Sequence, residues 1–519
     1  MRGFIMFYIG VDIGTTSTKA VLFTEETKVH CVSHVEYPLH SPLPMIAEQD
    51  PEEIFQAVIK AIKNVVDMSG AGPDDIRFVS FSSAMHSIIA VDEQGLPITA
   101  CITWADSRSK AWADKIKNEM DGHGIYMRTG TPIHPMSPLA KIAWLTHDCP
   151  DIAEKTYKYI SIKEYVFYKL FSQFVIDHSI ASATGLFSLA DLDWDEEALR
   201  AAGITRDRLS EPVATTWHTA GMKEQFAEKM GLSVRTAFVI GASDGVLSNL
   251  GVNAIDPGIV AVTIGTSGAI RTVTDRPVTD EKGRIFCYAL TDKHWVIGGP
   301  VNNGGMTFRW LRDELASAEV ETARRLGIDS YEVLTQIASR VKPGAEGLLF
   351  HPYLAGERAP LWNPDARGSF FGLGMHHKKE HMVRAVLEGV IFNLYTVLLA
   401  LQELIGVPEK IKATGGFARS PLWRQMLADI FNQEVEIPES FESSCLGAVV
   451  LGRYAIGEIQ DFSVVKTLVG TTHVHTPNTQ HVEVYEELIP IYISIYRKLE
   501  EEYASITAFQ NKWVNEILE

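Results

Sequence analysis

The sequence contains few cysteines, and those it has are widely spaced. Its 519 residues include five, none of them in a C-x-x-C pair: Cys31, Cys101, Cys149, Cys287 and Cys445. Scattered thiols of this kind argue against a disulfide framework and against a cysteine-based zinc site. We therefore expect reduced thiols and a cytoplasmic protein.

Positive charge is also scarce. The chain has 47 lysines and arginines against 65 aspartates and glutamates, which gives a formal net charge of -18. This balance argues against a general nucleic-acid binder and against a basic protein of membrane surfaces. We expect small-molecule partners, and an anionic substrate would need a local positive pocket.

Long hydrophobic runs are missing as well. Residues 1–11 are apolar but lead directly into Asp12 and lack a small-residue cleavage site, so we expect a first strand there. The longest apolar helix candidate, residues 390–401, contains Asn393 and Thr396 and is too short to span a bilayer. We expect it to be a core helix, and we expect no membrane partner.

Strand and helix patterns alternate along the chain. Runs rich in Val, Ile, Phe and Tyr predict strands at roughly 5–12, 18–24, 28–37 and 77–83. Asp50 and Pro51 mark the start of a helix that runs to about Met68. A long amphipathic helix is expected near 478–509, interrupted or bent at Pro490. The alternation predicts an α/β fold, and the length suits two domains.

A short motif occurs twice, about half a chain apart. "VDIGTTS" at 11–17 aligns with "VTIGTSG" at 262–268, which suggests two related halves with a boundary near 251–257. Only the first copy carries a carboxylate, because Thr263 stands where Asp12 stands. A chance match of so short a string is the alternative.

Both copies end in turns that could bind phosphate. Backbone N–H groups of a glycine-rich turn, helped by hydroxyls, form a cradle for phosphate oxygens, and an aspartate beside them suits Mg²⁺. The alternative for each turn is a plain β-hairpin. A third glycine pair, Gly415-Gly416 in "ATGGFARSPLW" (413–423), could let a flat ring approach the backbone or could form a tight loop.

Two longer stretches carry a resemblance to a known family. "MSPLAKIAWL" (136–145) and "GSFFGLGMHHKKEHMVRAVLEG" (368–389) resemble the two signatures of the FGGY carbohydrate kinases, and the similarity extends over roughly residues 6–505. It implies two actin-like ATPase (ribonuclease H-like) domains facing across a cleft. Residues 1–250 would hold the sugar site, the first phosphate motif and the catalytic base. Residues 251–519 would hold the second phosphate motif, the adenosine motif and the C-terminal helix.

The resemblance also implies roles for single residues. The catalytic base falls on Asp244 in "IGASDGVLSNLG" (240–251), although Asp244 could also cap a helix beginning near Gly245. ATP and Mg²⁺ are the expected cofactors, with the metal near Asp12 and Asp244. The implied nucleotide contacts are Asp12, Gly14, Thr15, Thr16, Ser17, Lys19, Gly265, Thr266, Gly305, Gly415, Gly416 and Arg419.

Three stretches match the family's sugar contacts: "SSAMHS" (82–87), "TWADSR" (103–108) and "GTPIHPMSPLAK" (130–141). The implied contacts are Met85, His86, Trp104, Asp106, Arg108, His134 and Met136. Trp104 and His86 could instead belong to the core. Candidate partners for a substrate carboxylate are Arg108, His86, His134 and Lys141, and Lys141 could instead be structural.

These stretches are most similar to the gluconate kinases of the family. Met85-His86 stands where glycerol kinases have Arg-Glu, and Trp104-Ala105-Asp106 stands where xylulose kinases often have Trp-Asn-Asp. We therefore expect ATP-dependent conversion of D-gluconate to 6-phospho-D-gluconate. The alternatives are a xylulose or other pentulose or polyol kinase and, more remotely, a non-catalytic actin-like ATPase or sugar sensor. A homodimer is a further expectation from similar kinases.

Overall fold

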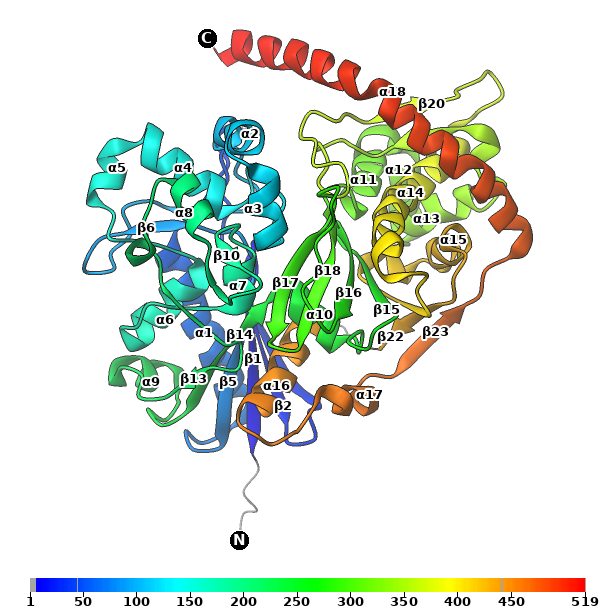
Figure 1. The fold of residues 1–519 in the computed structure, drawn as a ribbon. Helices are drawn as coiled ribbons and strands as arrows, with labels where there is room; N and C mark the ends of the chain where they lie inside the picture. The colour runs from blue at the N-terminus through cyan, green and yellow to red at the C-terminus, as the bar shows by residue number, and fades with distance from the viewer. Residues whose placement is uncertain (1–5, 44, 440–441, 519) are drawn as a thin grey trace. The chain divides into compact units, whose positions relative to one another are not determined.

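The computed structural model describes residues 6–43, 45–439 and 442–518, so the first residue of the strand expected at 5–12 lies outside it. The chain forms two compact units (Figure 1). Unit 1 comprises Met1–Pro257, Val273–Ile297 and Glu442–Gly470, and unit 2 comprises Gly258–Thr272, Gly298–Phe441 and Thr471–Glu519. The chain thus crosses between the units several times. The division into domains 1–250 and 251–519 stays a prediction.

Unit 1 is built on a six-stranded sheet with the order β13-β14-β5-β1-β2-β3. Its strands are β1 (Phe7–Ile13), β2 (Ser17–Thr24), β3 (Val29–Glu36), β5 (Ile76–Ser83), β13 (His218–Thr219) and β14 (Ala237–Ser243). β1, β5 and β14 run parallel, and Ser82 is in register with both Asp12 and Ala242. The carboxyl ends of these three strands therefore meet at one edge, where α/β folds commonly bind ligands.

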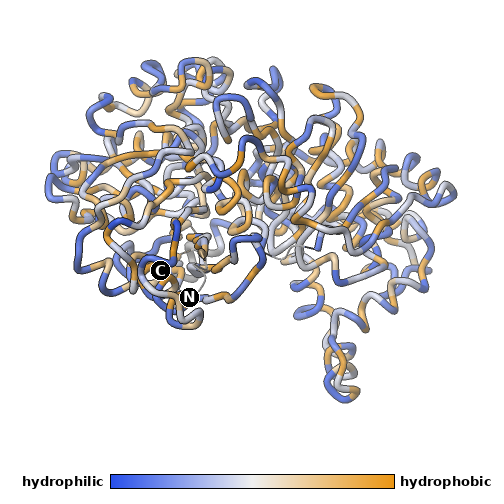
Figure 2. The backbone as a smooth tube through the Cα atoms, turned by 90° about the horizontal axis from the view of Figure 1, so that it is seen from below, coloured by the Kyte–Doolittle hydropathy of each residue, from blue (hydrophilic) through white to orange (hydrophobic). Residues whose placement is uncertain are grey.

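Helix α1 (Pro51–Ser69) covers this sheet and confirms the expected start. The Asp50 side chain accepts a hydrogen bond from the Glu52 N–H at 2.8 Å, and Pro51 occupies the first turn. One face of α1, including Ile54, Phe55 and Val58, is buried in the same core as β1 and β5. Figure 2 shows the resulting alternation of hydrophobic and hydrophilic stretches along the backbone.

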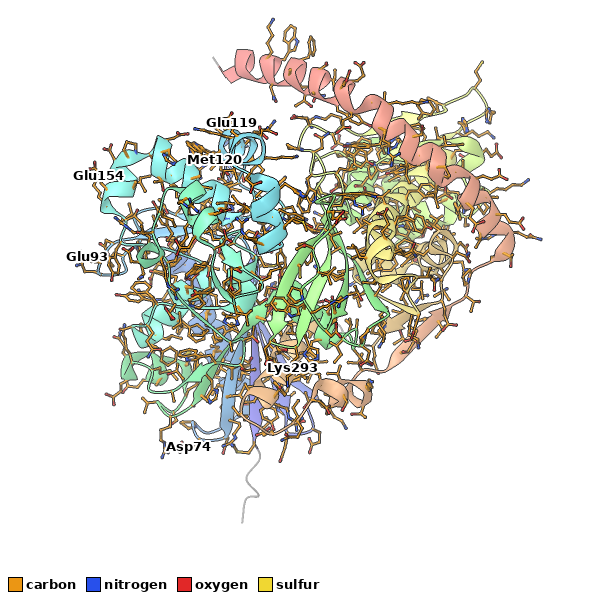
Figure 3. The ribbon with its side chains drawn as sticks, in the orientation of Figure 1. Asp74, Glu93, Glu119, Met120, Glu154 and Lys293 are labelled. Atoms are coloured by element: carbon orange, nitrogen blue, oxygen red, sulfur yellow. The ribbon has the colours of Figure 1, made fainter. Side chains whose placement is uncertain are left out.

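The remaining elements of unit 1 are short. The helices are α2 (Lys110–Glu119), α3 (Gly122–Thr129), α4 (Pro138–Asp148), α5 (Pro150–Lys155), α6 (Ile162–Phe171), α7 (His178–Ser182), α8 (Glu196–Ala202), α9 (Glu224–Met230), α10 (Asp244–Gly251), α16 (Ser443–Ala455) and α17 (Val465–Leu468). The small strands are β4 (Glu48–Gln49), β6 (Ile89–Val91), β7 (Cys101–Ile102), β8 (Lys158–Ile160), β9 (Val175–Asp177), β10 (Phe187–Ser188), β11 (Asp193–Trp194) and β12 (Glu211–Val213). Acidic side chains such as Asp74, Glu93, Glu119 and Glu154 lie on the outside (Figure 3).

The second sheet repeats the plan of the first. Its order is β17-β18-β16-β15-β21-β22-β23. The strands are β15 (Ile259–Ile264), β16 (Gly268–Thr274), β17 (Phe286–Thr291), β18 (His294–Val301), β21 (Lys410–Thr414), β22 (Val435–Pro438) and β23 (Thr471–His475). As in unit 1, an antiparallel hairpin, β15–β16, is followed outward from β15 by two parallel strands, β21 and β22. This shared topology supports the predicted duplication.

Helix α14 (Lys379–Ile405) corrects one prediction. It is longer than the expected 390–401, so it is not too short to span a membrane: by length and composition it could, but 78% of its apolar stretch is buried. The sequence did not reveal where the helix starts, because Arg384 and Glu388 are charged. In the structure these two side chains are buried as an ion pair of 2.7 Å. α14 is a core helix, as expected.

The other elements of unit 2 include the C-terminal helix, whose predicted length is corrected. They are α11 (Gly305–Trp310), α12 (Ser317–Leu326), α13 (Ser330–Ala338), α15 (Pro421–Phe431), α18 (Thr479–Leu518), β19 (Leu349–His351) and β20 (Ser369–Phe371). α18 continues through Pro490, so the helix is not interrupted there, and Figure 1 shows it curving along its length. It is also longer than expected, reaching Leu518 rather than about residue 509.

Candidate active site

The first glycine–threonine turn joins β1 to β2. The Gly14 N–H donates to the Ser17 carbonyl at 2.9 Å, which closes the turn. The turn is held from outside: Trp104 Nε1 donates to Thr15 Oγ1 at 2.9 Å, and Gln49 Nε2 donates to the Thr15 carbonyl at 2.6 Å. A residue of the expected sugar segments therefore contacts the expected phosphate turn directly. Thr16 is exposed in this turn.

Asp12 and Asp244 are brought together at the strand ends. Asp12 is the second-last residue of β1 and accepts a hydrogen bond of 2.7 Å from Ser82 Oγ. Burial of the carboxyl, together with the nearby charge of Asp244, raises the pKa of Asp12 to about 6. Two carboxylates that repel each other in a partly buried site form an oxygen-rich donor set that fits a hard divalent cation.

The protein supplies only part of a complete coordination shell at this place. Within residues 6–43, 45–439 and 442–518, no three His, Cys, Asp or Glu side chains cluster closely enough to hold a metal ion by themselves. Mg²⁺ commonly keeps several waters and is shared between one or two carboxylates and substrate phosphates. The donor set at Asp12 and Asp244 suits that arrangement better than a fully protein-ligated metal site.

The structure moves the expected helix cap by one residue. Ser243 is the N-cap of α10 and Asp244 is its first residue, so Asp244 does not cap the helix in the expected sense. Its Oδ1 accepts a hydrogen bond of 2.7 Å from the Gly245 N–H. The reason is that β14 continues to Ser243, so the strand passes into the helix without an intervening loop residue.

Buried polar groups form hydrogen bonds with the backbone at the end of β14. Lys163 Nζ donates to the Ala242 carbonyl at 3.1 Å and pairs with Asp177 at 2.7 Å. The Ser243 N–H donates to Ser179 Oγ at 3.1 Å. These contacts fix the backbone immediately before Asp244, and sequence reasoning missed them because Lys163 and Asp177 belong to no motif that we singled out.

Lys19 lies opposite Asp12 on β2. Its Nζ pairs with Glu442, just before α16, at 2.8 Å. That carboxylate raises the pKa of Lys19, although burial acts in the other direction. The Lys19 charge is thus placed beside the first phosphate turn, and its contact with nucleotide stays a prediction.

Two histidines and two methionines of the expected sugar site lie within or near the core. His86 is buried with a left-handed φ of 66°, and its Nδ1 lies 2.8 Å from the Ala183 carbonyl. His134 Nδ1 accepts a hydrogen bond from the Met136 N–H at 3.1 Å. Met136 is buried, and Met85 packs partly buried against two apolar clusters.

Arg108 and Asp106 are occupied by each other. Arg108 Nε donates to Asp106 Oδ2 at 3.0 Å, and the guanidinium also pairs with Glu48. Asp106 is buried and accepts the Ala47 N–H at 3.0 Å. Two carboxylates therefore balance the single charge of Arg108, and the pair braces the segment that carries Trp104.

Unit 2 contains a cavity of about 610 Å³, within the usual size range of ligand pockets. It is lined by five of the residues expected to contact nucleotide: Gly265, Thr266, Gly305, Gly416 and Arg419. Its aromatic wall is formed by Phe308, Tyr331 and Trp423, with ring centroids of Phe308 5.0 Å from Tyr331 and 5.6 Å from Trp423. A planar base could stack in such a pocket.

Gly415 is required for the backbone and is not a wall of the cavity. Its φ is 106°, and a Cβ there would lie 2.3 Å from the Ile264 carbonyl oxygen. The helix that follows has Ser420 as N-cap and Pro421 in the first turn. Gly415 makes the tight turn and Gly416 lines the cavity, and the approach of a flat ring to this backbone stays a prediction.

The loop that ends at Gly304, together with the first residues of α11, covers the second glycine–threonine turn. The Gly305 N–H donates to the Gly265 carbonyl at 2.7 Å, and the Met306 N–H donates to the Thr266 carbonyl at 3.0 Å. Behind the loop, the buried Glu357 accepts hydrogen bonds from Asn303 at 2.9 Å and from Asn393 at 2.7 Å. Burial raises the pKa of Glu357, while these hydrogen bonds oppose the shift.

Comparison with known proteins identifies the family. The model of the FGGY carbohydrate kinase N-terminal domain matches residues 7–251, and that of the C-terminal domain matches residues 260–456. The chain belongs to the FGGY family of carbohydrate kinases. The predictions of family, of an ATP-dependent sugar kinase and of an α/β fold with two actin-like, sheet-containing domains are thereby confirmed. ATP is the phosphoryl donor of kinases in this family.

Relatives of this FGGY kinase include proteins named as gluconate kinases and proteins named as xylulose kinases. It is 62% identical to the gluconokinase of Bacillus subtilis over 97% of this chain and 98% of the relative. The crystal structure of a gluconate kinase from Lactobacillus acidophilus superposes with a TM-score of 0.92 at 37% identity, covering 97% of this chain and all of the other. A ligand-bound xylulose kinase from the same organism gives a TM-score of 0.91, also at 37% identity, over 96% of this chain and all of the other.

Sequence reasoning missed several residues of these sites. Phe308, Tyr331 and Trp423 come from three separate segments of the chain, and no local pattern predicts that their rings meet. Ser82 was within a quoted stretch, but its contact with Asp12 depends on the register of β1 and β5. The family signature contained Lys141, whose surroundings only the structure shows.

Proposed function

We propose that this FGGY kinase transfers the γ-phosphoryl group of ATP to the 6-hydroxyl of D-gluconate, giving 6-phospho-D-gluconate and ADP. The observation that carries the proposal is the 62% identity, over nearly the full length of both chains, to a gluconokinase. Unit 2 would bind ATP in the cavity lined by Gly265, Thr266 and Gly416. Unit 1 would bind the sugar acid near Trp104 and His86.

In the proposed mechanism Asp244 is the general base. Its carboxylate hydrogen-bonds the sugar hydroxyl and takes the proton as the hydroxyl oxygen bonds to the γ-phosphorus, while the bond to the ADP oxygen breaks. Asp244 is suited to this role because the Ala242–Ser243 backbone before it is anchored by Lys163 and Ser179.

We also propose that Asp12 and Asp244 hold Mg²⁺, directly or through water, together with phosphate oxygens. When bound, the ion neutralises charge on the transferring phosphoryl group. Asp12 would bind it as the carboxylate, so the cation would oppose the effects of burial and of Asp244 that raise the Asp12 pKa. Ser82 would orient the Asp12 carboxylate through its hydrogen bond to Oδ1.

The sugar carboxylate needs cationic or N–H partners. Of the four candidates, Arg108 is balanced by Asp106 and Glu48, and Lys141 Nζ donates to backbone carbonyls. His86 and His134 are therefore the two candidates to test first. In a neutral His134 ring, acceptance of the Met136 N–H at Nδ1 places the proton on Nε2, which makes Nε2 a donor.

D-Xylulose is the second candidate substrate. The observation in its favour is the solved structure of a chain described as a xylulose kinase, which is as similar in sequence to this protein as the solved gluconate kinase is. Xylulose has no carboxylate, so variants of His86 and His134 that selectively impair use of a sugar acid would separate the two.

The proposal is tested by measuring ADP release with Mg-ATP against D-gluconate, D-xylulose, L-ribulose, glycerol and a blank without sugar. We expect a high kcat/KM for gluconate alone, with 6-phosphogluconate as product. Preference for xylulose would replace the substrate but leave the family and the proposed base in place. Absence of turnover with any sugar would support a non-catalytic actin-like ATPase or sugar sensor.

A further inference from the structure

Lys141 on α4 is wholly buried, yet among the described residues no carboxylate lies within hydrogen-bond distance of its charged end. Its Nζ donates instead to three backbone carbonyl oxygens: His86 at 2.8 Å, Thr103 at 2.6 Å and Met136 at 2.8 Å. An ammonium group has three N–H donors, so the three carbonyls use all of them. A substrate group could bind Nζ only by displacing one of these carbonyls.

The three carbonyls belong to three different segments, and these are the segments implied to contact the sugar. His86 lies in 82–87, Thr103 directly precedes Trp104, and Met136 lies two residues after His134. The three carbonyl residues, at positions 86, 103 and 136, are 17 to 50 residues apart in the chain. Lys141 is the point at which all three meet.

We propose that Lys141 is a positioning residue, whose ammonium group holds the three sugar-binding segments in one arrangement and does not bind the substrate. The proposal deepens the proposed function, because it assumes that these segments bind the sugar. The conformation of His86 supports it: a φ of 66° is uncommon for a residue with a side chain, and the carbonyl of this residue bonds to Lys141.

The charge on Lys141 is maintained at a cost. Burial lowers the pKa of Lys141 to about 7, while the nearby charge of Asp106 opposes the shift and that of Arg108 adds to it. A neutral amine has only two N–H donors, so one of the three buried carbonyls would lose its partner. An apolar side chain would leave all three carbonyls without this donor.

The test compares Lys141→Met with a matched control, Lys158→Met. Lys158 Nζ also donates to two backbone carbonyls, Asp207 at 2.8 Å and Leu209 at 2.7 Å, but away from the sugar segments. We expect Lys141→Met to raise the KM for the sugar at least about 10-fold and to leave the KM for ATP within about twofold. Lys158→Met should leave both values within about twofold. An unchanged sugar KM in Lys141→Met would overturn the proposal.

Hydrogen exchange of the protein without substrates gives a second readout. In Lys141→Met the amides of Ile88, Thr103 and Ser137, each hydrogen-bonded in the structure, should exchange faster together. Faster exchange in only one segment would contradict the proposed role. This readout does not depend on which sugar is used, so it still decides the role of Lys141 if the wild-type enzyme does not phosphorylate gluconate.

A version on the wild-type protein covers the case in which Lys141→Met does not fold. Exchange is then followed at increasing, sub-denaturing concentrations of urea. If Lys141 ties the segments together, the same three amides should open with one common free energy and one common dependence on urea. Separate openings of the three segments would overturn the proposal.

Discussion

The two glycine–threonine hairpins have the same strand connections but differ in turn geometry and in chemistry. In each, the glycine N–H donates to a serine carbonyl at 2.9 Å, Gly14 to Ser17 and Gly265 to Ser267. Each hairpin is also continued by two parallel strands. The strand position that is Asp12 in the first hairpin is Thr263 in the second, where its Oγ1 lies 3.3 Å from Thr414 Oγ1.

The residues that surround the two hairpins differ as well. The first hairpin is held by Trp104 and Gln49, and beside it burial and the charge of Asp244 raise the pKa of Asp12. The second is covered by Gly304 and the first residues of α11 and opens on an aromatic-walled cavity. We therefore predict that the first hairpin takes part in metal binding and the second in nucleotide binding.

The largest expected effect comes from replacing Asp244, whose charge acts on Asp12 in the first hairpin. Asp244→Asn is close to isosteric, so we expect the fold to persist while kcat falls at least about 100-fold. Steady-state kinetics with gluconate, and thermal unfolding as a control for the fold, measure this. Retained turnover would remove Asp244 from the role of base.

The pair Asp12→Asn and Thr263→Val tests the position at which the hairpins differ. We expect Asp12→Asn to lower kcat/KM for Mg-ATP about 10- to 100-fold and to raise the Mg²⁺ concentration needed for half-maximal rate. Thr263→Val, at the matched position, should change the same values less than about threefold. Equal losses of kcat/KM in the two variants would show that the two hairpins do not differ in their contribution to Mg-ATP use.

Gly304→Ala tests the cover of the second hairpin. A Cβ at Gly304 would lie 2.4 Å from the Ser267 carbonyl oxygen, so the loop must move away from the turn. We expect the KM for ATP to rise about 10-fold and the KM for the sugar to stay within about twofold. The control is Gly283→Ala, where the φ of 69° strains alanine but the Cβ has no neighbour within 4 Å, so it tests backbone strain without the clash. A change in sugar KM alone would contradict this assignment.

The smallest expected effect is on stability rather than turnover, and it concerns unit 2 but not unit 1. In unit 2, His351 is buried on β19, bonds to the Tyr492 carbonyl at 3.0 Å, and has its pKa lowered from 6.5 to about 4 by burial. The unfolded chain therefore binds more protons between these values, and stability falls as the pH drops from 6.5 to 4. The loss from this group is about 3 kcal/mol.

His351→Gln should remove that part of the pH dependence. Urea unfolding at pH 7 and at pH 4.5, monitored by hydrogen exchange in β19 and in β1, would measure it separately for the two units. The exposed His123→Gln variant in unit 1 is the control. An unchanged pH dependence in His351→Gln would contradict the linkage.

Local signals in the sequence predicted much of the fold. The helix start at Asp50–Pro51, the strands around Asp12 and the turn at Gly415 follow from propensities and caps that act within a few residues. The reading of α14 was wrong in length because a charged residue looks like a helix boundary until its buried partner is known. The cap at Asp244 was misplaced by one residue because β14 passes directly into α10.

The sequence by itself determined the two glycine–threonine turns, the difference between Asp12 and Thr263, and the family signatures. Only the tertiary structure decided that Asp12 meets Ser82 and Asp244, that three distant aromatic rings form one wall, and that Lys141 collects three carbonyls. The physical reason is range. Turns and caps depend on neighbours in the chain, whereas burial, pKa shifts and shared hydrogen bonds depend on strand register and packing between segments far apart in sequence.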